Sequence, residues 1–412
     1  MARAYFDYAA AAPLLPEARD AMVPFLGFEF GNPASLHRGG EVPRRAIETA
    51  RELVAALINA RPGEVVFESS ASEANNHAVK GLALSRMDKG RHIIISAIEH
   101  ASVLEPARSL ERLGFEVTRL PVDREGRVGP DTLAAAIRPD TILVSVMHAN
   151  YEVGVIQDIA ALAQVAHEHK ALFHSDGTAA VGRVPIDVVG LGVDAYSFPA
   201  QSIYGPKGAA ALFVKRGVRP VSLIEGGFQE NNRRAGTENV AAIAGFGAAA
   251  RVAGSELETW SADLARLSRR VVAELPRRLD HVVLTGPAAG RLPGHASFCV
   301  EFVEGEAMLL SLDDEGIAAA SGSSCTARTL KASHVLLALG LPHALAQSSL
   351  VLTLGWESTD AEVDYFLDKL PPIVQRLREM SPLYARHLRG EDPYATRPGE
   401  TCDNEHTHEE EN

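Results

Sequence analysis

Short apolar runs alternate with helical patterns from residue 41 to about residue 255 of this chain. Three of these runs, residues 92–96, 141–146 and 171–176, read HIIIS, TILVSV and ALFHSD, which is typical of strands buried on both faces. Residues 158–170, between the second and third runs, have apolar side chains at helical spacing. A strand, a crossover helix and a further strand make the repeating unit of a parallel sheet. The sequence therefore predicts a doubly wound α/β sheet, with ligand-binding groups at the carboxyl ends of its strands.

A second, smaller region is predicted after residue 255. A long helical pattern covers 255–279, and two short strand candidates and two further helical patterns follow it. The chain then becomes polar, punctuated by Gly and Pro, and finally acidic, which predicts disorder. We therefore expect three parts: a large α/β domain with the N-terminal segment (1–255), a small C-terminal α+β domain (256–385) and a disordered acidic tail (386–412).

The charge and the cysteine content narrow the class of protein. The formal net charge is −13, and residues 391–412 hold eight acidic residues against Arg397 alone, so nucleic acid is not expected as a partner. No apolar stretch reaches the length of a membrane span, and the N-terminus lacks a signal pattern. Three scattered cysteines do not make a disulfide framework. These features predict a cytoplasmic protein without a membrane partner.

Eight motifs, in order along the chain, resemble those of cysteine desulfurases, which belong to the class V aminotransferase family. They are YFDYAAAAPLLPEA (5–18), GNPASLHRGG (31–40), FESSASEANN (67–76), IEHASVLE (98–105), MHANYEVGVIQDI (147–159), FHSDGTAAVGRVPIDV (173–188), RRAGTENV (233–240) and ASGSSCTARTL (320–330). The segment 194–208, DAYSFPAQSIYGPKG, is similar to the stretch that carries the cofactor lysine in that family. The resemblance covers about residues 4–380.

The resemblance implies a fold and a chemistry. The fold is the fold-type I architecture of pyridoxal-phosphate-dependent transferases, and the assembly is a homodimer with both active sites at its interface. The cofactor is pyridoxal phosphate. The family reaction converts cysteine to alanine and passes sulfur to an enzyme cysteine as a persulfide, for iron–sulfur clusters or thiolated cofactors. The resemblance therefore also implies an iron–sulfur scaffold or another sulfur-acceptor protein as a partner.

Four residues match family positions that contact the cofactor or the substrate. The resemblance implies that Ser72 binds the phosphate, that His100 stacks on the ring and moves protons, and that Asp176 pairs with the ring nitrogen. It also implies that Asn32 contacts the substrate carboxylate. Three of the four have a structural alternative: serines in 70–72 suit a helix N-cap, a histidine is a common polar residue at a strand end, and an aspartate often caps a turn.

Ser202 occupies the position of the lysine that bonds to the cofactor in the family. A hydroxyl cannot form an imine, so covalent attachment of the cofactor at residue 202 is not expected. Further cofactor and substrate positions differ from the family in the same way: Ala11, Ala12, Tyr151, Ala179, Pro199, Gln201 and Val351. Val351 replaces an arginine that binds the cysteine carboxylate, and losing such a contact costs about 1.5–3 kcal/mol.

Three cysteine or lysine positions need separate interpretation. Cys325 matches the persulfide-forming nucleophile, and its retention has a chemical and a chance explanation. Lys207, five residues after Ser202, is expected to point away from the cofactor. Cys402 lies with His406 and His408 in the acidic tail, where a solvated tail is favoured over a metal site, so no metal is expected.

Three functions follow from this pattern. The favoured one is a degenerate cysteine desulfurase of sulfur transfer and iron–sulfur assembly that acts as a scaffold, a regulator or a sulfur relay through Cys325. The alternative is an enzyme that holds pyridoxal phosphate non-covalently and carries out the family reaction or a different one. A third is a sulfur or cluster carrier built on Cys325. Whether the chain is an enzyme stays open at this point.

Overall fold

A seven-stranded sheet forms the centre of the computed structural model, which describes residues 3–322 and 332–394. Its strand order is β2-β8-β7-β6-β5-β3-β4. The strands span Val65–Glu68 (β2), Ala210–Val214 (β8), Ala195–Pro199 (β7), Leu172–Asp176 (β6), Thr141–Ser145 (β5), His92–Ser96 (β3) and Glu116–Leu120 (β4). The three predicted strands are confirmed and run parallel, whereas β8 runs antiparallel to both of its neighbours.

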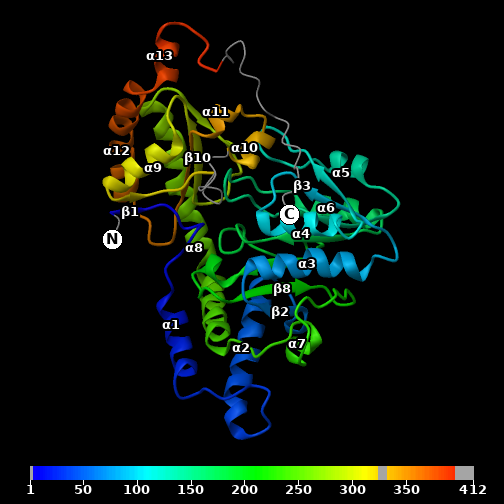
Figure 1. The fold of residues 1–412 in the computed structure, drawn as a ribbon. Helices are drawn as coiled ribbons and strands as arrows, with labels where there is room; N and C mark the ends of the chain where they lie inside the picture. Colours follow the sequence, from blue (N-terminus) through cyan, green and yellow to red (C-terminus); the bar gives the residue numbers. More distant parts are fainter. Residues whose placement is uncertain (1–2, 323–331, 395–412) are drawn as a thin grey trace, which may run out of the picture.

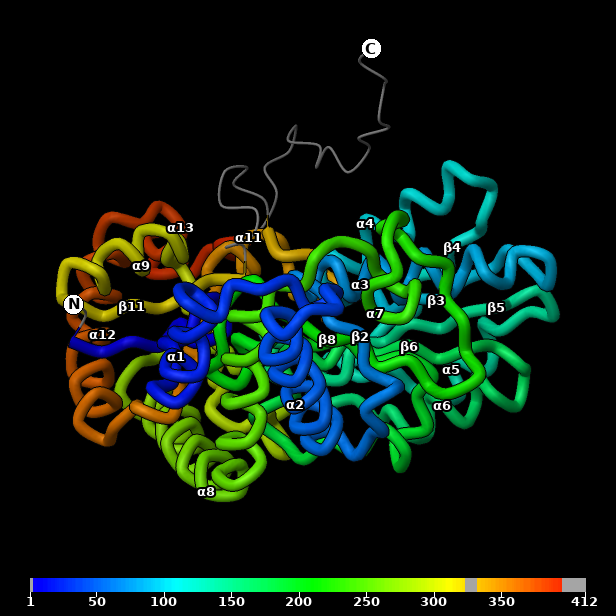
Figure 2. The backbone as a smooth tube through the Cα atoms, turned by 90° about the horizontal axis from the view of Figure 1, so that it is seen from below, coloured from blue at the N-terminus to red at the C-terminus, as the bar shows by residue number. Residues whose placement is uncertain are grey.

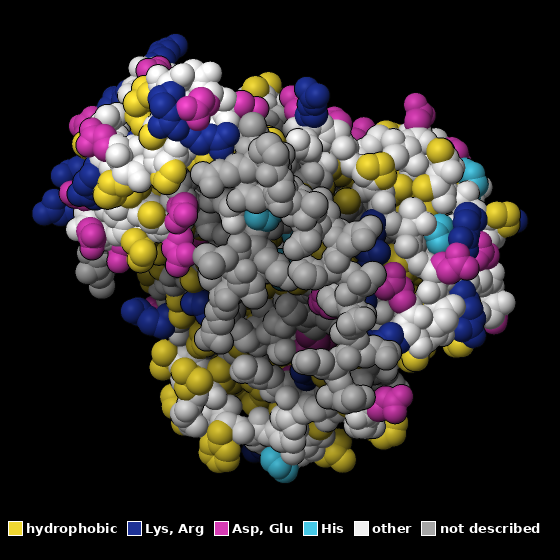
Figure 3. All heavy atoms as spheres, turned by 45° about the horizontal axis from the view of Figure 1, so that its top comes forward, with side chains coloured by type: hydrophobic (Ala, Val, Ile, Leu, Met, Phe, Trp, Pro, Cys, Tyr) yellow, Lys and Arg dark blue, Asp and Glu magenta, His cyan; other side chains and the backbone are white. Residues whose placement is uncertain are grey.

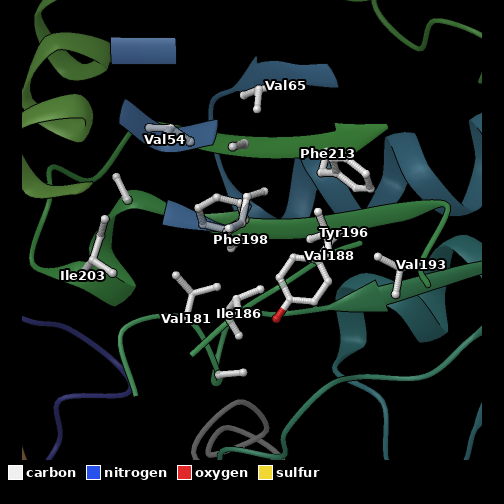
Figure 4. Close-up of a cluster of buried hydrophobic side chains, with 14 of the residues drawn as sticks. Val54, Val65, Val181, Ile186, Val188, Val193, Tyr196, Phe198, Ile203 and Phe213 are labelled. Atoms are coloured by element: carbon white, nitrogen blue, oxygen red, sulfur yellow. The ribbon is translucent and has the colours of Figure 1, made fainter. Parts of the chain in front are cut away.

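Helices cover both faces of this sheet, which confirms the doubly wound prediction (Figure 1). One hydrophobic cluster joins alternate strand residues, such as Val65 and Phe67, to α2 (Glu41–Leu57), α5 (Pro130–Ala136) and α6 (Ile159–Glu168). The other joins residues of the opposite face, such as Val66, to α3 (Ala71–Ser85) and α4 (Ala101–Glu111). Figure 4 shows part of the first cluster, with Phe198, Tyr196 and Phe213 among its buried side chains.

A second cluster of elements lies beside the large sheet. Its sheet has the order β12-β10-β9, with all pairs antiparallel, and a two-stranded sheet pairs β1 with β11. These elements span Ser349–Thr353 (β12), His295–Val300 (β10), Val282–Leu284 (β9), Ala4–Tyr5 (β1), Ile317–Ala318 (β11), Gly305–Asp314 (α9) and Asp360–Glu379 (α12). Ala4 and Phe6 are buried in this cluster, whereas Leu15 and Ala18 are buried in the core of the large sheet, so the N-terminal segment contacts both.

Helix α8 (Val240–Arg278) is longer than the sequence predicted. It begins at residue 240, where the Asn239 side chain accepts a hydrogen bond from the backbone amide of Ala242, rather than at residue 255. Its first half packs along α1 (Pro16–Met22) and α2, and its second half packs into the smaller cluster (Figure 2). Among the described helices, α8 alone is long and apolar enough by composition to span a membrane, a test that a buried core helix also passes. Half of that apolar window is buried inside the protein.

The remaining described helices are α7 (Gln229–Asn232), α10 (His334–Ala338), α11 (His343–Ala346) and α13 (Pro382–Leu388). Residues 386–388, the first residues of the predicted tail, complete α13. Basic and acidic side chains are interspersed on the face seen in Figure 3, and apolar side chains gather at its lower end. Exposed apolar residues near α1 and α2 include Val23, Leu26, Phe28, Phe30 and Leu36, which we call the N-terminal apolar patch.

Candidate active site

A cavity of about 360 Å³ lies where the central sheet meets the smaller cluster. Part of its wall comes from residues that follow β2, β3, β6 and β7, at the carboxyl ends of these strands, as the sequence predicted. Another part comes from β10 and β12. The eight cofactor and substrate positions named above as departures from the family pattern all line this cavity: Ala11, Ala12, Tyr151, Ala179, Pro199, Gln201, Ser202 and Val351.

The first turn of α3 forms one section of the wall. Ser70 is its N-cap, because the Ser70 side chain accepts a hydrogen bond of 3.1 Å from the Glu73 backbone amide. Ser72 is exposed on the cavity wall and does not cap the helix. Glu73 pairs with Arg234 at 2.8 Å. Burial opposes ionisation of Glu73, but hydrogen bonds from Arg234, Glu68 and Ser69 outweigh it and lower its pKa to about 2. Free amides and the helix dipole favour an anion at this turn.

A chain of hydrogen bonds joins Asp176 to His100. The buried Asp176 accepts from Thr178 N at 2.9 Å, as in a capped turn, and from Asn75 Nδ2 at 2.7 Å. Asn75 Nδ2 also donates to Ser102 Oγ at 2.9 Å, and this hydroxyl lies 2.7 Å from His100 Nδ1. Since His100 Nδ1 also accepts from the Ser102 amide, a neutral His100 carries its proton on Nε2. The capping role and a cofactor role for Asp176 are therefore compatible.

Ser202 has a defined contact on the cavity wall. It lies in the short helix η4 (Ala200–Ile203), directly after β7, and its hydroxyl donates to the Thr178 carbonyl at 2.7 Å. Ser202 is partly buried. The side chain at residue 202 therefore starts from the cavity wall, on the same strand ends that carry Asp176.

Several wall residues were not identified from the sequence. Lys207, which was expected to point away from the cofactor, is among the residues that line the cavity. Its place follows from the pairing of Glu68 with Ala210, which brings the residues before β8 beside those after β2. Arg183 and Glu152 also line the cavity. Arg183 lies seven residues after Asp176, in a segment without regular secondary structure. Because this segment has no strand or helix period, the sequence does not indicate where the Arg183 side chain points.

Other predicted residues lie elsewhere. Asn32 is exposed in the loop before α2, its Oδ1 accepts from Ala34 N at 2.8 Å, and it does not line the cavity of this chain. A substrate role for Asn32 stays a prediction. Cys325, Cys402 and the tail histidines lie outside the described residues. Cys299 is buried in β10, and burial raises its pKa to about 12, so it is a core thiol.

Glu99 is the most unusual carboxyl group beside the site. It precedes His100, is fully buried, and accepts hydrogen bonds from Ser96 Oγ at 2.5 Å and from Met147 N at 2.8 Å. Burial raises its pKa to about 8, and the nearby Asp176 adds to this effect, whereas the two hydrogen bonds lower it. Glu99 is therefore mostly neutral at pH 7.

We expect Glu99→Gln to flatten the fall in stability on the alkaline side. The pKa of Glu99 is higher in the folded than in the unfolded protein, so its contribution is complete below the unfolded pKa and is lost as pH rises through about 8. Glutamine cannot ionise, so the free energy of unfolding should fall less between about pH 5 and pH 9, by on the order of a few kcal/mol. Urea unfolding of both proteins across this range measures the difference, and identical pH profiles would contradict it.

Comparisons with known proteins give one consistent result. The family described as Aminotransferase class-V matches residues 4–366. The cysteine desulfurase IscS of Dictyoglomus turgidum is 47% identical over 378 residues, covering 92% of this chain and 96% of that protein. IscS 1 of Archaeoglobus fulgidus is 44% identical over 382 residues, covering 93% and 100%. Among solved structures, a NifS-like protein has a TM-score of 0.85 at 32% identity, covering 92% of this chain and 100% of its own. DndA of Streptomyces lividans has a TM-score of 0.71 at 34% identity, covering 85% and 99%.

Proposed function

This chain belongs to the cysteine desulfurases of the class V aminotransferase family, and we propose that it binds pyridoxal phosphate without a covalent bond and works in sulfur transfer as a scaffold, regulator or relay. Members of this family depend on pyridoxal phosphate and serve sulfur transfer and iron–sulfur assembly. One observation carries the proposal. The Ser202 hydroxyl donates a hydrogen bond to the Thr178 carbonyl. On the same cavity wall, an unbroken chain of hydrogen bonds links Asp176 to His100.

The cavity wall keeps several groups that suit pyridoxal phosphate, although residue 202 cannot form the covalent bond and other family contacts are replaced. Asp176 is a buried carboxylate suited to a protonated ring nitrogen, and the first turn of α3 with Ser72 is suited to a phosphate. His100 is an imidazole on the same wall. Thr178 Oγ1 is buried without a hydrogen-bond partner among the described residues, as expected of a group that awaits a ligand. Lys207 is the one lysine that lines the cavity among the described residues, and it is exposed.

The residues present support binding more than turnover. When bound, pyridoxal phosphate supplies an electron sink. Asp176 would hold the ring nitrogen, and His100 Nε2 would offer a proton to a neighbouring acceptor. Ser202 supplies neither an amine for covalent exchange nor a base for the α-proton of an amino acid. Desulfuration of free cysteine is therefore expected to be very slow.

The same proposal includes partners and a location. The N-terminal apolar patch supports a homodimer, since exposed apolar area of this kind marks protein contacts. Light scattering tests this, and a monomer at all concentrations would oppose it. We further propose a cytoplasmic protein that meets an iron–sulfur scaffold or other sulfur acceptor, with Cys325 carrying sulfur. Persulfide labelling that is lost in Cys325→Ser and kept in Cys299→Ser is the expected result for a relay.

Reversible cofactor binding is the central test. Wild-type protein titrated with pyridoxal phosphate should show saturable binding by fluorescence or calorimetry, and after borohydride reduction and gel filtration it should carry no cofactor. Asp176→Asn keeps the side-chain shape but loses the charge, so it should weaken binding roughly 10- to 150-fold. The proposal fails if the wild-type protein binds no cofactor, or if borohydride fixes the cofactor to one of its lysines.

A second candidate is an enzyme that uses the non-covalently held cofactor. The intact hydrogen-bond chain from Asp176 to His100 favours it, because a scaffold does not require this arrangement. Conversion of cysteine to alanine by the wild-type protein, abolished in Asp176→Ala, would support this candidate over the scaffold.

A further inference from the structure

The cavity lacks a cation at residue 351, where the family binds a substrate carboxylate. Val351 lies in β12, pairs across the sheet with Ser297, and presents an apolar side chain to the cavity. An anion in this section of the wall therefore needs a donor from another element. Two cationic side chains line the cavity among the described residues, Arg183 and Lys207.

These two cations lie on different sections of the wall. Lys207 comes just before β8, whose pairing with β2 brings this part of the chain near the residues between β2 and α3. Arg183 instead contacts the loop before β10, since its Nη1 donates to the Pro293 carbonyl at 3.3 Å. A phosphate bound at the α3 N-terminus would therefore lie near Lys207. Arg183 would remain available to bind a second anion.

Arg183 also lies next to Ser202. A Cβ placed on Gly182 would come within 2.7 Å of the Ser202 carbonyl oxygen, so the backbone just before Arg183 packs directly against residue 202. Gly182 has a φ of +80°, a backbone conformation that residues with a side chain rarely adopt, so this position favours glycine. The Arg183 side chain therefore starts beside the point from which the family's lysine would act.

The guanidinium of Arg183 has capacity for a ligand. It has five N–H donors, of which the one long bond to Pro293 uses one, and it forms no ion pair with any described residue. Arg291, also near this section, differs in both respects. It donates to the carbonyls of Pro287, Val153 and Thr285, and it does not line the cavity.

We propose that Arg183 binds the carboxylate of an α-amino acid held in this cavity, in place of the guanidinium that the family has at residue 351. This inference rests on the proposed function, because it assumes that the cavity is a ligand site of the desulfurase type. A guanidinium fits a carboxylate with two parallel hydrogen bonds. Residue 183 would thus select amino acids over amines that lack a carboxylate.

Calorimetric titration with L-alanine tests this role, because alanine has no sulfur to lose. Wild-type protein should bind L-alanine, both with and without pyridoxal phosphate, and should not bind ethylamine, which lacks the carboxylate. Arg183→Gln should weaken L-alanine binding roughly 10- to 150-fold and leave the affinity for pyridoxal phosphate unchanged. Arg183→Lys should fall between the two, since lysine keeps the charge but not the paired donors.

Restoring the guanidinium at the family position provides the matched control. Adding Val351→Arg to Arg183→Gln should recover L-alanine binding. The inference is overturned if the wild-type protein does not bind L-alanine, if Arg183→Gln binds it as tightly as the wild type, or if Arg183→Gln loses the cofactor to the same degree. A wild-type protein that binds L-alanine but not pyridoxal phosphate would instead overturn the proposed function and leave Arg183 in place.

Discussion

Replacing Ser202 with lysine is expected to create a covalent site for pyridoxal phosphate and to raise cysteine desulfuration by roughly 10²- to 10⁴-fold, the usual gain from a positioned proton-transfer group. The side chain at residue 202 already lies on the cavity wall, after β7 and beside Asp176. The substitution removes the hydrogen bond to the Thr178 carbonyl, a loss of about 0.5–1.5 kcal/mol that the fold should tolerate. Borohydride reduction followed by peptide mapping should locate the cofactor on residue 202.

Ser202→Met is the control, because methionine has a long side chain without an amine. It should give neither a fixed cofactor nor a gain in rate. If Ser202→Lys takes up the cofactor without any gain in desulfuration, the missing carboxylate contact at Val351 becomes the limiting change, and Val351→Arg should be added. A Ser202→Lys protein that fixes no cofactor would show that the cavity does not present residue 202 to the ligand, against our interpretation of the site.

The second large effect is expected from a buried ion pair behind the α3 N-terminus. Arg51 of α2 meets Glu230 through two hydrogen bonds, of 2.7 Å and 2.8 Å, and both side chains are almost completely buried. The Phe67 amide also donates to Glu230, at 3.0 Å. Glu230→Ala removes the buried counter-charge of Arg51 and leaves the Phe67 amide without its acceptor, so the free energy of unfolding should fall by about 3–5 kcal/mol. Urea unfolding measures this as a shift of the midpoint.

Glu48→Ala supplies a comparison within the same cluster. Glu48 also pairs with Arg51, at 3.3 Å, but its side chain is 58% exposed. Water screens such a pair, so its removal should cost less than about 1 kcal/mol. If the two variants lost the same free energy of unfolding, burial would not determine how much each ion pair contributes to stability.

Much of the fold could be predicted because the signals are local. The apolar runs of β3, β5 and β6 and the helical period of α6 lie within short windows of sequence. The early start of α8 was missed because Ala and Gly residues dominate its first half, and they give a weak apolar period. The antiparallel direction of β8 and the pairing of β1 with β11 depend on distant contacts, which periodicity does not report.

The candidate site shows the same division. The resemblance identified positions that the fold brings to one cavity, from Ala11 to Val351, although more than three hundred residues separate them. Arg183 and Lys207 were missed because the direction of a loop side chain depends on packing against other elements. The packing of Gly182 against Ser202 positions Arg183, and the pairing of β2 with β8 positions Lys207.

Helix α8 sets a mechanical limit on this cavity. One unbroken helix of 39 residues contributes Phe246 and Trp260 to the cluster under the large sheet and Leu264 and Val271 to the smaller cluster. The large sheet and the smaller cluster, which face each other across the cavity, are therefore attached to a single helix. Moving them apart would require that helix to bend. We expect the width of the cavity to vary little between the free and ligand-bound protein. Size selection among ligands then follows from the helix geometry as much as from the side chains on the wall.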